Sequence, residues 1–176
     1  TRGRGGIVEN IYLQDIKLDR MYMDTITFTT FYKAWFGTDS GPVPNFRDFH
    51  IKNLEANNCG IALNFQGLPE RPLENLVLEN ISITNADSGA VLEDVRDVRA
   101  KNVHIQAKQG EAMKLTNCQN IILENPVLEG SGDTDLNVKG NRNTGIMLVG
   151  ASAQKCRIAL DHEVAPDAVR SCEDKK

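Results

Sequence analysis

Several side chains near the start of the chain have the chemistry to bind a carboxylate or a sugar. Arg2 and Arg4 alternate with glycine in the opening Thr-Arg-Gly-Arg-Gly-Gly, and Lys33 follows Tyr32 in the first long interval. Guanidinium groups bind carboxylates through paired hydrogen bonds, and aromatic faces stack on sugar rings. Glu70, in Gly-Leu-Pro-Glu, is a loop carboxylate that can accept a sugar hydroxyl. For each of them the alternative is a solvated surface charge or local packing of a loop.

The other titratable residues lack the spacing of a catalytic or metal site. His50 and His104 occupy outward positions of alternating segments, and no Cys or His spacing is typical of a zinc site. Glu93, Asp94 and Asp97 form a small acidic group. We expect Asp97 to be a structural corner residue and Glu93 or Asp94 to be exposed. The sequence therefore predicts no metal and no cofactor.

The glycines and two of the cysteines have structural roles by their positions. No helical pattern follows the opening glycines, so a tight turn rather than a phosphate-binding loop is expected at Gly3, Gly5 and Gly6. Cys156 and Cys172 bracket 15 residues near the end of the chain. They are a disulfide pair in an oxidising compartment or two free thiols, and the sequence leaves both possibilities open.

A nine-residue phrase that recurs five times indicates the elements that position these residues. It reads Asn or Asp, apolar, any residue, apolar, any residue, Asn or Asp, apolar, any residue, apolar, and its copies begin at Asn10, Asp48, Asn75, Asp97 and Asn120. The alternation predicts two short strands, each with one buried face, and Asn or Asp suits the bent backbone of a corner between them. The copies are separated by 38, 27, 22 and 23 residues, so the additional residues form loops on a constant cross-section.

A third strand per repeat is indicated by similar apolar segments at residues 60–63, 89–92, 112–115 and 145–148. Three strands and three turns per coil predict an all-β fold, a right-handed parallel β-helix. About five rungs over residues 1–150 give a stack roughly 24 Å tall. We expect corner Asn side chains to hydrogen-bond from rung to rung, and Ile81, Val103 and Ile121 to form aliphatic stacks in the interior. A leucine-rich repeat has a similar period, but the connecting segments lack the amphipathic helix of that fold.

Residues 151–176 are expected to close the stack. Residues 156–160 read as one last strand, residues 163–170, which include Pro166, as a turn and short helix, and the charged end from Ser171 as frayed chain.

Composition limits the class of protein. At 176 residues the chain has the size of one domain, and a net charge of −4 argues against nucleic-acid binding. No apolar stretch reaches the length of a membrane span.

Two segments of the chain resemble glycoside hydrolase family 28, the polygalacturonases. Residues 1–11 resemble the segment that follows the Arg-Ile-Lys motif of that family, and residues 67–76, Gly-Leu-Pro-Glu-Arg-Pro-Leu-Glu-Asn-Leu, look like the matching region of bacterial members. The later rungs fit as well. The resemblance implies a right-handed parallel β-helix that hydrolyses pectic polysaccharide with inversion. It also implies that Arg2 and Arg4 lie beside a substrate carboxylate, and that Tyr32 contacts the substrate.

The catalytic motifs of the family are missing from this sequence. Inversion needs an acid and a base about 6.5–9.5 Å apart, which the family supplies from an Asn-Thr-Asp motif and an Asp-Asp pair, supported by Gly-His-Gly and Arg-Ile-Lys. No Asp-Asp occurs here, Asp133-Thr134-Asp135 is not Asn-Thr-Asp, and no histidine is flanked by glycines. We therefore expect the C-terminal portion of a longer enzyme, inactive alone, with catalytic aspartates and further rungs of the same protein N-terminal to Thr1.

The resemblance implies a secreted or periplasmic protein that acts on pectic polysaccharide or an oligogalacturonide. Two other functions stay open. One is a non-catalytic β-helix that binds carbohydrate or is structural, and the other is a leucine-rich-repeat interaction protein.

Overall fold

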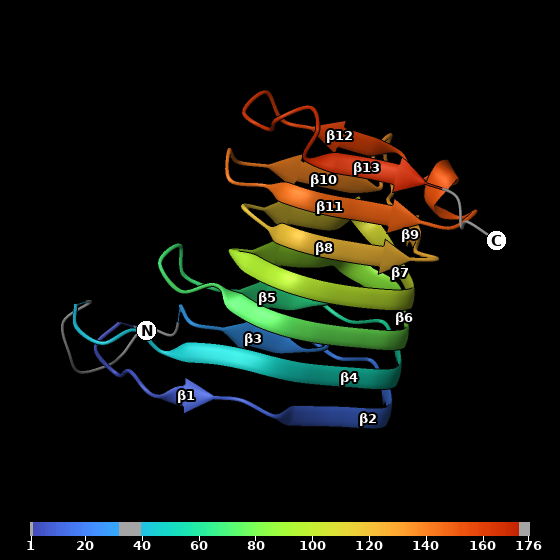
Figure 1. Ribbon diagram of the computed structural model, residues 1–176. Helices are drawn as coiled ribbons and strands as arrows, with labels where there is room; N and C mark the ends of the chain where they lie inside the picture. Colours follow the sequence, from blue (N-terminus) through green and yellow to red (C-terminus); the bar gives the residue numbers. More distant parts are fainter. Residues whose placement is uncertain (1, 32–39, 173–176) are drawn as a thin grey trace.

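The chain forms a parallel β-helix of about five turns (Figure 1). The computed structural model describes residues 2–31 and 40–172. Its only helical element in this part is a 3₁₀ turn, η1 (Ala153–Lys155), and no described helix is long and apolar enough to cross a membrane. The strands are β1 (Ile7–Val8), β2 (Ile11–Asp19), β3 (Thr27–Thr29), β4 (Asn45–Asn57), β5 (Asn64–Gln66), β6 (Leu73–Glu93), β7 (Val95–Thr116), β8 (Gln119–Glu124), β9 (Val127–Glu129), β10 (Leu136–Lys139), β11 (Thr144–Val149), β12 (Ile158–Leu160) and β13 (Val169–Cys172). The predicted β-helix is confirmed, and the leucine-rich repeat is wrong.

Three parallel sheets run along the axis, one for each strand of the repeat. The first sheet holds residues 11–14, 49–52, 76–79, 98–101, 121–124, 146–149 and 169–172. The second sheet holds residues 16–19, 54–57, 81–84, 103–106 and 127–129. The third sheet holds β3, β5, residues 91–93 and 114–116, β10 and β12. In each of them alternate side chains point into one shared core.

The corner between the first and second sheets is made by the second Asn or Asp of each phrase. The backbone there is left-handed, with φ of 55° at Asp15, 53° at Asn53, 54° at Asn80 and 53° at Asn102. Asn and Asp adopt this conformation more readily than other non-glycine residues. Asn53 Nδ2 donates to Asp15 Oδ1 at 2.8 Å, and Asn80 Nδ2 donates to Asn53 Oδ1 at 3.1 Å. Asn102 continues the series onto Asn80 at 3.0 Å, so the predicted ladder is confirmed.

Aliphatic side chains fill the interior in continuous stacks. Ile81, Val103 and Ile121 are each at most 2 % exposed, as predicted. Ile81 and Val103 are partners in the second sheet, whereas Ile121 pairs with Val98 in the first. The expected stacks therefore exist, and Ile121 belongs to a different one from Val103.

The two ends of the core are not alike. In the first turn the inward residues are only partly buried, namely Ile11, Leu13, Ile16 and Leu18. Their partners one turn later are each 1 % exposed, namely Phe49, Ile51, Leu54 and Ala56. At the other end η1 and the turns before β13 cover the core with Ala153 (1 % exposed) and Val164 (7 %). The N-terminal end thus presents apolar side chains and an unpaired edge of β2 in the part of the chain that is described.

One predicted third strand belongs to another sheet. Residues 145–148 are in the first sheet, because Ile146 pairs with Ile121, and the third strand of the preceding turn is β10. Gly145 and Gly150 take the left-handed corner positions here, with φ of 64° and 105°. Since glycine adopts this backbone without an Asn or Asp side chain, the repeat continues here without its usual corner residues.

The closing segment is only partly as predicted. The strand expected at residues 156–160 is confirmed as β12, but the short helix expected at residues 163–170 is wrong. Val164 N donates to Asp161 O and Ala168 N donates to Ala165 O. These are two separate turns, the second of which contains Pro166, and the chain then enters β13. Cys156 and Cys172, left open by the sequence, are both free thiols.

Candidate functional site

Two of the residues predicted to bind the substrate, Arg2 and Glu70, form an ion pair. Arg2 Nε lies 2.5 Å from Glu70 Oε1, and Arg2 Nη2 lies 3.2 Å from Oε2. One guanidinium therefore holds both carboxylate oxygens. These hydrogen bonds keep the pKa of Glu70 below its ordinary value, so this carboxylate stays ionised.

The opening glycines form the tight turn that was predicted for them. Gly3 N and Gly5 N both donate to Pro42 O at 3.0 Å. Gly5 has φ of 57°, and a Cβ there would lie 2.9 Å from Pro42 Cβ. Asn45 N in turn donates to Gly6 O at 2.9 Å. The opening segment is thus stacked on residues 41–45.

This segment and the loop with Glu70 share one edge of the third sheet. Residues 41–44 close the connection that follows β3, and residues 67–72 connect β5 to β6. Because strands of a parallel sheet all end on one side, these connections lie at the same edge, where Figure 1 shows the N-terminus. We call this the third-sheet edge. Through Arg2 and Glu70 it brings together the described part of the first segment that carries the resemblance, residues 2–11, and the second segment, residues 67–76.

Of the three other predicted residues, one lies on the same turn as Arg2 and two fall outside the described residues. Arg4 is exposed on the opening turn, two residues from the Arg2 ion pair. Tyr32 and Lys33 lie outside the described residues. The structure therefore places Arg2, Arg4 and Glu70 together at the third-sheet edge and gives no position for the other two.

A second ion pair at the same edge was not predicted. The sequence predicted that Glu93 or Asp94 would be exposed, but Asp94 is buried, with a 5 % exposed side chain, and its backbone is left-handed, with φ of 48°. Arg142 Nη2 reaches Asp94 Oδ1 at 2.7 Å from the turn after β10. Burial raises the pKa of Asp94, and the positive charge of Arg142 opposes that rise. Asp94 directly follows the third strand of its turn, which ends at Glu93, and this position in the sequence could have identified it as a corner residue.

Close backbone packing explains one glycine of the second motif. A Cβ on Gly67 would lie 2.2 Å from Asp94 O and 2.5 Å from Leu73 N. No side chain fits between these two stretches of backbone. Gly67 thus allows the loop with Glu70 to lie directly against the turn at Asp94.

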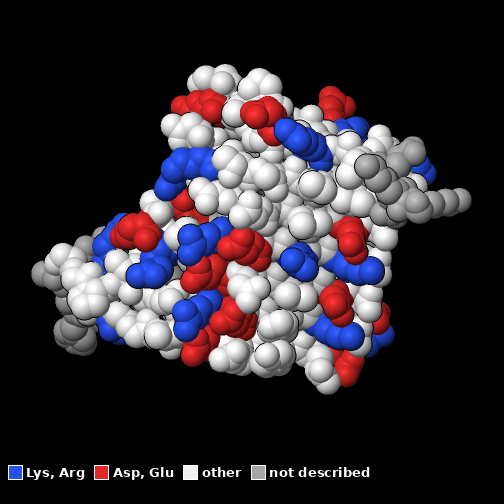
Figure 2. Space-filling model, viewed as in Figure 1, with Lys and Arg blue, Asp and Glu red and all other residues white. Residues whose placement is uncertain are grey.

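The outward face of the first sheet carries two bands of alternating charge. Near the start of the strands Arg47 Nε donates to Glu9 at 2.7 Å, and Arg96 Nε donates to Glu74 at 2.8 Å. Near their end, Lys52 lies 3.3 Å from Glu79 and Lys101 lies 3.4 Å from Glu124. Figure 2 shows acidic and basic side chains on either side of a largely uncharged band. Within each band the charges neutralise one another from turn to turn.

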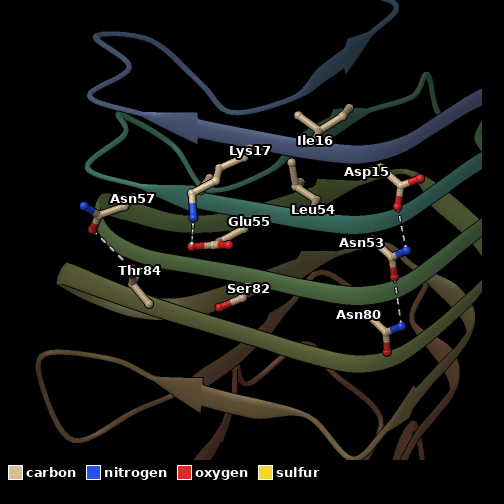
Figure 3. Close-up of a pocket in the computed structure, with 11 residues that line it drawn as sticks. Asp15, Ile16, Lys17, Asn53, Leu54, Glu55, Asn57, Asn80, Ser82 and Thr84 are labelled. Atoms are coloured by element: carbon tan, nitrogen blue, oxygen red, sulfur yellow. Dashed lines mark hydrogen bonds and ion pairs between the residues drawn. The ribbon is translucent and has the colours of Figure 1, made fainter.

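A large hollow lies on the outside of the second sheet (Figure 3). It has a volume of about 690 Å³ and is lined by the corner ladder at Asp15, Asn53 and Asn80. Lys17 Nζ spans it to reach Glu55 at 3.0 Å, and Thr84 bonds Asn57 at 3.2 Å. These polar groups bond one another, so the hollow is built of structural contacts.

The histidines of the repeat face outward, as predicted. His50 stacks on Tyr12 with ring centroids 4.6 Å apart, and His104 Nε2 lies 3.7 Å from Glu129. Among residues 2–31 and 40–172 no group of His, Cys, Asp or Glu is arranged to hold a metal ion.

The sequence matches no family model, and neither a curated protein nor a solved structure gave a match to it.

Proposed function

We propose that this chain is the C-terminal part of a polygalacturonase-like glycoside hydrolase that cleaves galacturonosyl linkages in pectic polysaccharide with inversion. The observation that carries this proposal is the third-sheet edge. Arg2 and Glu70 come from the two segments that resemble the family and lie 68 residues apart in sequence, and their ion pair joins the segments in space. A parallel β-helix is also the fold that the resemblance implies.

The arginines have a clear chemical role in this proposal. A polyuronate carries a carboxylate on each sugar, and a guanidinium binds carboxylate more specifically than an ammonium does. Glu70 binds the Arg2 guanidinium and so holds the opening turn in place. We therefore propose that Glu70 positions this turn and does not contact the substrate. Arg4 lies exposed on the same turn, and we assign its guanidinium to a substrate carboxylate.

The acid and the base must be carboxyl groups that are free to contact water and the glycosidic oxygen. At the third-sheet edge Glu70 is bound by Arg2 and Asp94 by Arg142. Neither carboxylate meets that requirement. We therefore place the catalytic aspartates on further turns that precede Thr1. The partly buried apolar residues of the first turn, such as Leu13 and Ile16, provide a surface on which such turns would stack.

The test is release of reducing sugar from polygalacturonate by this chain and by the protein extended upstream of Thr1. Activity in the extended form alone is the expected result. Activity in this chain would show that its own carboxylates are catalytic. Inactivity of both would favour a β-helix that binds carbohydrate without cleaving it.

A further inference from the structure

We propose that the outward face of the first sheet is a second binding site for an extended acidic polysaccharide, separate from the third-sheet edge. The nature of the polymer rests on the proposed function. The site itself rests on one row of side chains that are register partners in successive turns, namely Tyr12, His50, Val77, Arg99, Ile122, Met147 and Arg170. We call it the first-sheet row.

Three hollows follow this row along the axis. The first, of about 170 Å³, is lined by Tyr12, His50 and Val77. The second, of about 490 Å³, contains Val77, Arg99 and Ile122. The third, of about 360 Å³, contains Met147 and Arg170. Because the first two share Val77, and Ile122 pairs with Met147, the hollows form a track along the solenoid axis.

The row offers apolar and aromatic contacts at both ends. Tyr12 is 66 % exposed and Met147 is 39 % exposed. The Tyr12 ring lies parallel to the His50 ring, at an interplanar angle of 9°, so one ring supports the other. A supported, exposed aromatic ring is a suitable platform for the apolar face of a sugar.

The positive charges of the row differ from those beside it. Lys52 and Lys101 are paired with Glu79 and Glu124. Arg99 and Arg170 form no ion pair or hydrogen bond with any side chain in the described part of the chain, and both are exposed. They lie three turns apart, roughly 14 Å at the spacing of β-strands. An extended chain with a carboxylate on each sugar can reach both.

The outward face of the first sheet is unsuited to two other kinds of extended ligand, a peptide strand and a nucleic acid. The backbone groups of the first sheet are bonded between turns, so no peptide strand can add to this face. Two arginines on a chain of net charge −4 are far from the basic surface that nucleic acid requires. A polysaccharide binds instead through stacking, hydroxyl contacts to the flanking charged bands, and its carboxylates.

The test is calorimetric titration of the chain with a galacturonic acid decamer and with a neutral galactose decamer. We expect Arg99→Gln to weaken binding of the acidic decamer about three- to tenfold, the effect of losing one charge-assisted hydrogen bond. Lys155→Gln is the matched control, because it removes the same charge from an exposed residue of η1, outside the row. Arg4→Gln, measured in parallel, reports binding at the third-sheet edge.

Three results would overturn the second site. They are equal weakening by Arg99→Gln and Lys155→Gln, weakening by Arg4→Gln alone, or equal affinity for the neutral decamer. Hydrolysis of a disaccharide or trisaccharide by the upstream-extended protein should be unchanged by Arg99→Gln, because so short a ligand at the third-sheet edge does not reach the first-sheet row. If the hydrolase proposal is wrong, the upstream-extended protein will not hydrolyse the substrate. If the second-site proposal is wrong, Arg99→Gln will not weaken binding of the acidic decamer.

Discussion

Asp135 shows how one buried carboxylate can close a loop. Its side chain is 5 % exposed, and its Oδ2 accepts hydrogen bonds from Arg157 N at 3.0 Å and Arg157 Nε at 2.9 Å. Oδ1 accepts from Gly130 N at 3.0 Å. The hydrogen bonds from Arg157 are the main reason that the pKa of Asp135 falls to about 2 from an ordinary 3.8. The carboxylate that the sequence offered in Asp-Thr-Asp is thus committed to structure.

We predict that Asp135→Asn lowers the free energy of unfolding by about 2 kcal/mol at pH 7, from a pKa shift of nearly two units. Because the folded pKa is depressed, this stabilisation is complete above about pH 4 and is lost as the pH falls towards 2. Urea denaturation at pH 7, 4 and 2.5 measures it. The difference between the two proteins should shrink over that range.

Asp133→Asn is the control, because Asp133 is exposed in the same loop. It should change stability by less than about 0.5 kcal/mol at every pH. A pH-independent loss in Asp135→Asn would contradict the role given to its charge.

Gly67 makes the second residue-level prediction. Since a Cβ would lie 2.2 Å from a backbone oxygen, Gly67→Ala should destabilise the protein by about 3 kcal/mol through displaced backbone. Gly132→Ala is the matched control, because nothing lies within 4 Å of a Cβ there. Thermal unfolding monitored by circular dichroism compares the two. Equal melting temperatures would show that the loop moves freely and that Gly67 is not required by packing.

Single residues of the site were only partly predictable from the sequence. Arg2 and Glu70 were each identified by chemical type, but their pairing depends on the stacking of turns 68 residues apart. Glu93 or Asp94 was expected to be exposed, because nothing in the sequence reveals that Arg142 reaches Asp94 from two turns away. Residue type predicts what a side chain can do, whereas the register between turns decides what it contacts.

The strands and corners were predictable because their signal is local. Alternation defines a strand, and Asn or Asp defines a left-handed corner, as at Asn53 and Asn80. The pattern failed where Gly145 and Gly150 provide the same backbone without the side chain. It failed again at residues 163–170, which form separate turns because Pro166 has no N–H to donate to a helix.

The corner ladder gives a prediction at the level of the repeat. Asn80→Ala removes the hydrogen bonds to Asn53 and Asn102 and places alanine at φ of 54°. We expect a loss of about 2–3 kcal/mol in the free energy of unfolding. Asn80→Gly loses the same hydrogen bonds but tolerates the backbone, so its loss should be smaller by about 1 kcal/mol. Equal losses, measured by urea denaturation, would show that backbone strain makes no contribution at this corner.

The overall architecture followed from the repeat, because each turn contacts only its neighbours and the same phrase must stack on itself. The ends did not follow, because a terminal turn has a neighbour on one side only. The C-terminal end is covered by Ala153 and Val164, whereas Leu13 and Ile16 are only partly buried at the other end.

This asymmetry predicts the behaviour of the isolated chain. An unpaired β-strand edge with apolar side chains beside it is a template for pairing. We expect the chain to self-associate at micromolar concentrations in sedimentation velocity experiments, and Ile16→Lys, which places a charge on that end, to reduce the association. A monomer at all concentrations would show that the open end needs no partner.

The central claim is that the third-sheet edge belongs to an inverting hydrolase whose acid and base precede Thr1. The most direct measurement is proton NMR of a trigalacturonate solution during incubation with the upstream-extended protein. The account predicts a new reducing end whose first-formed anomer is opposite to the bond that was cleaved, and no product with this chain alone. A product of retained configuration, or no cleavage by the extended protein, would contradict it.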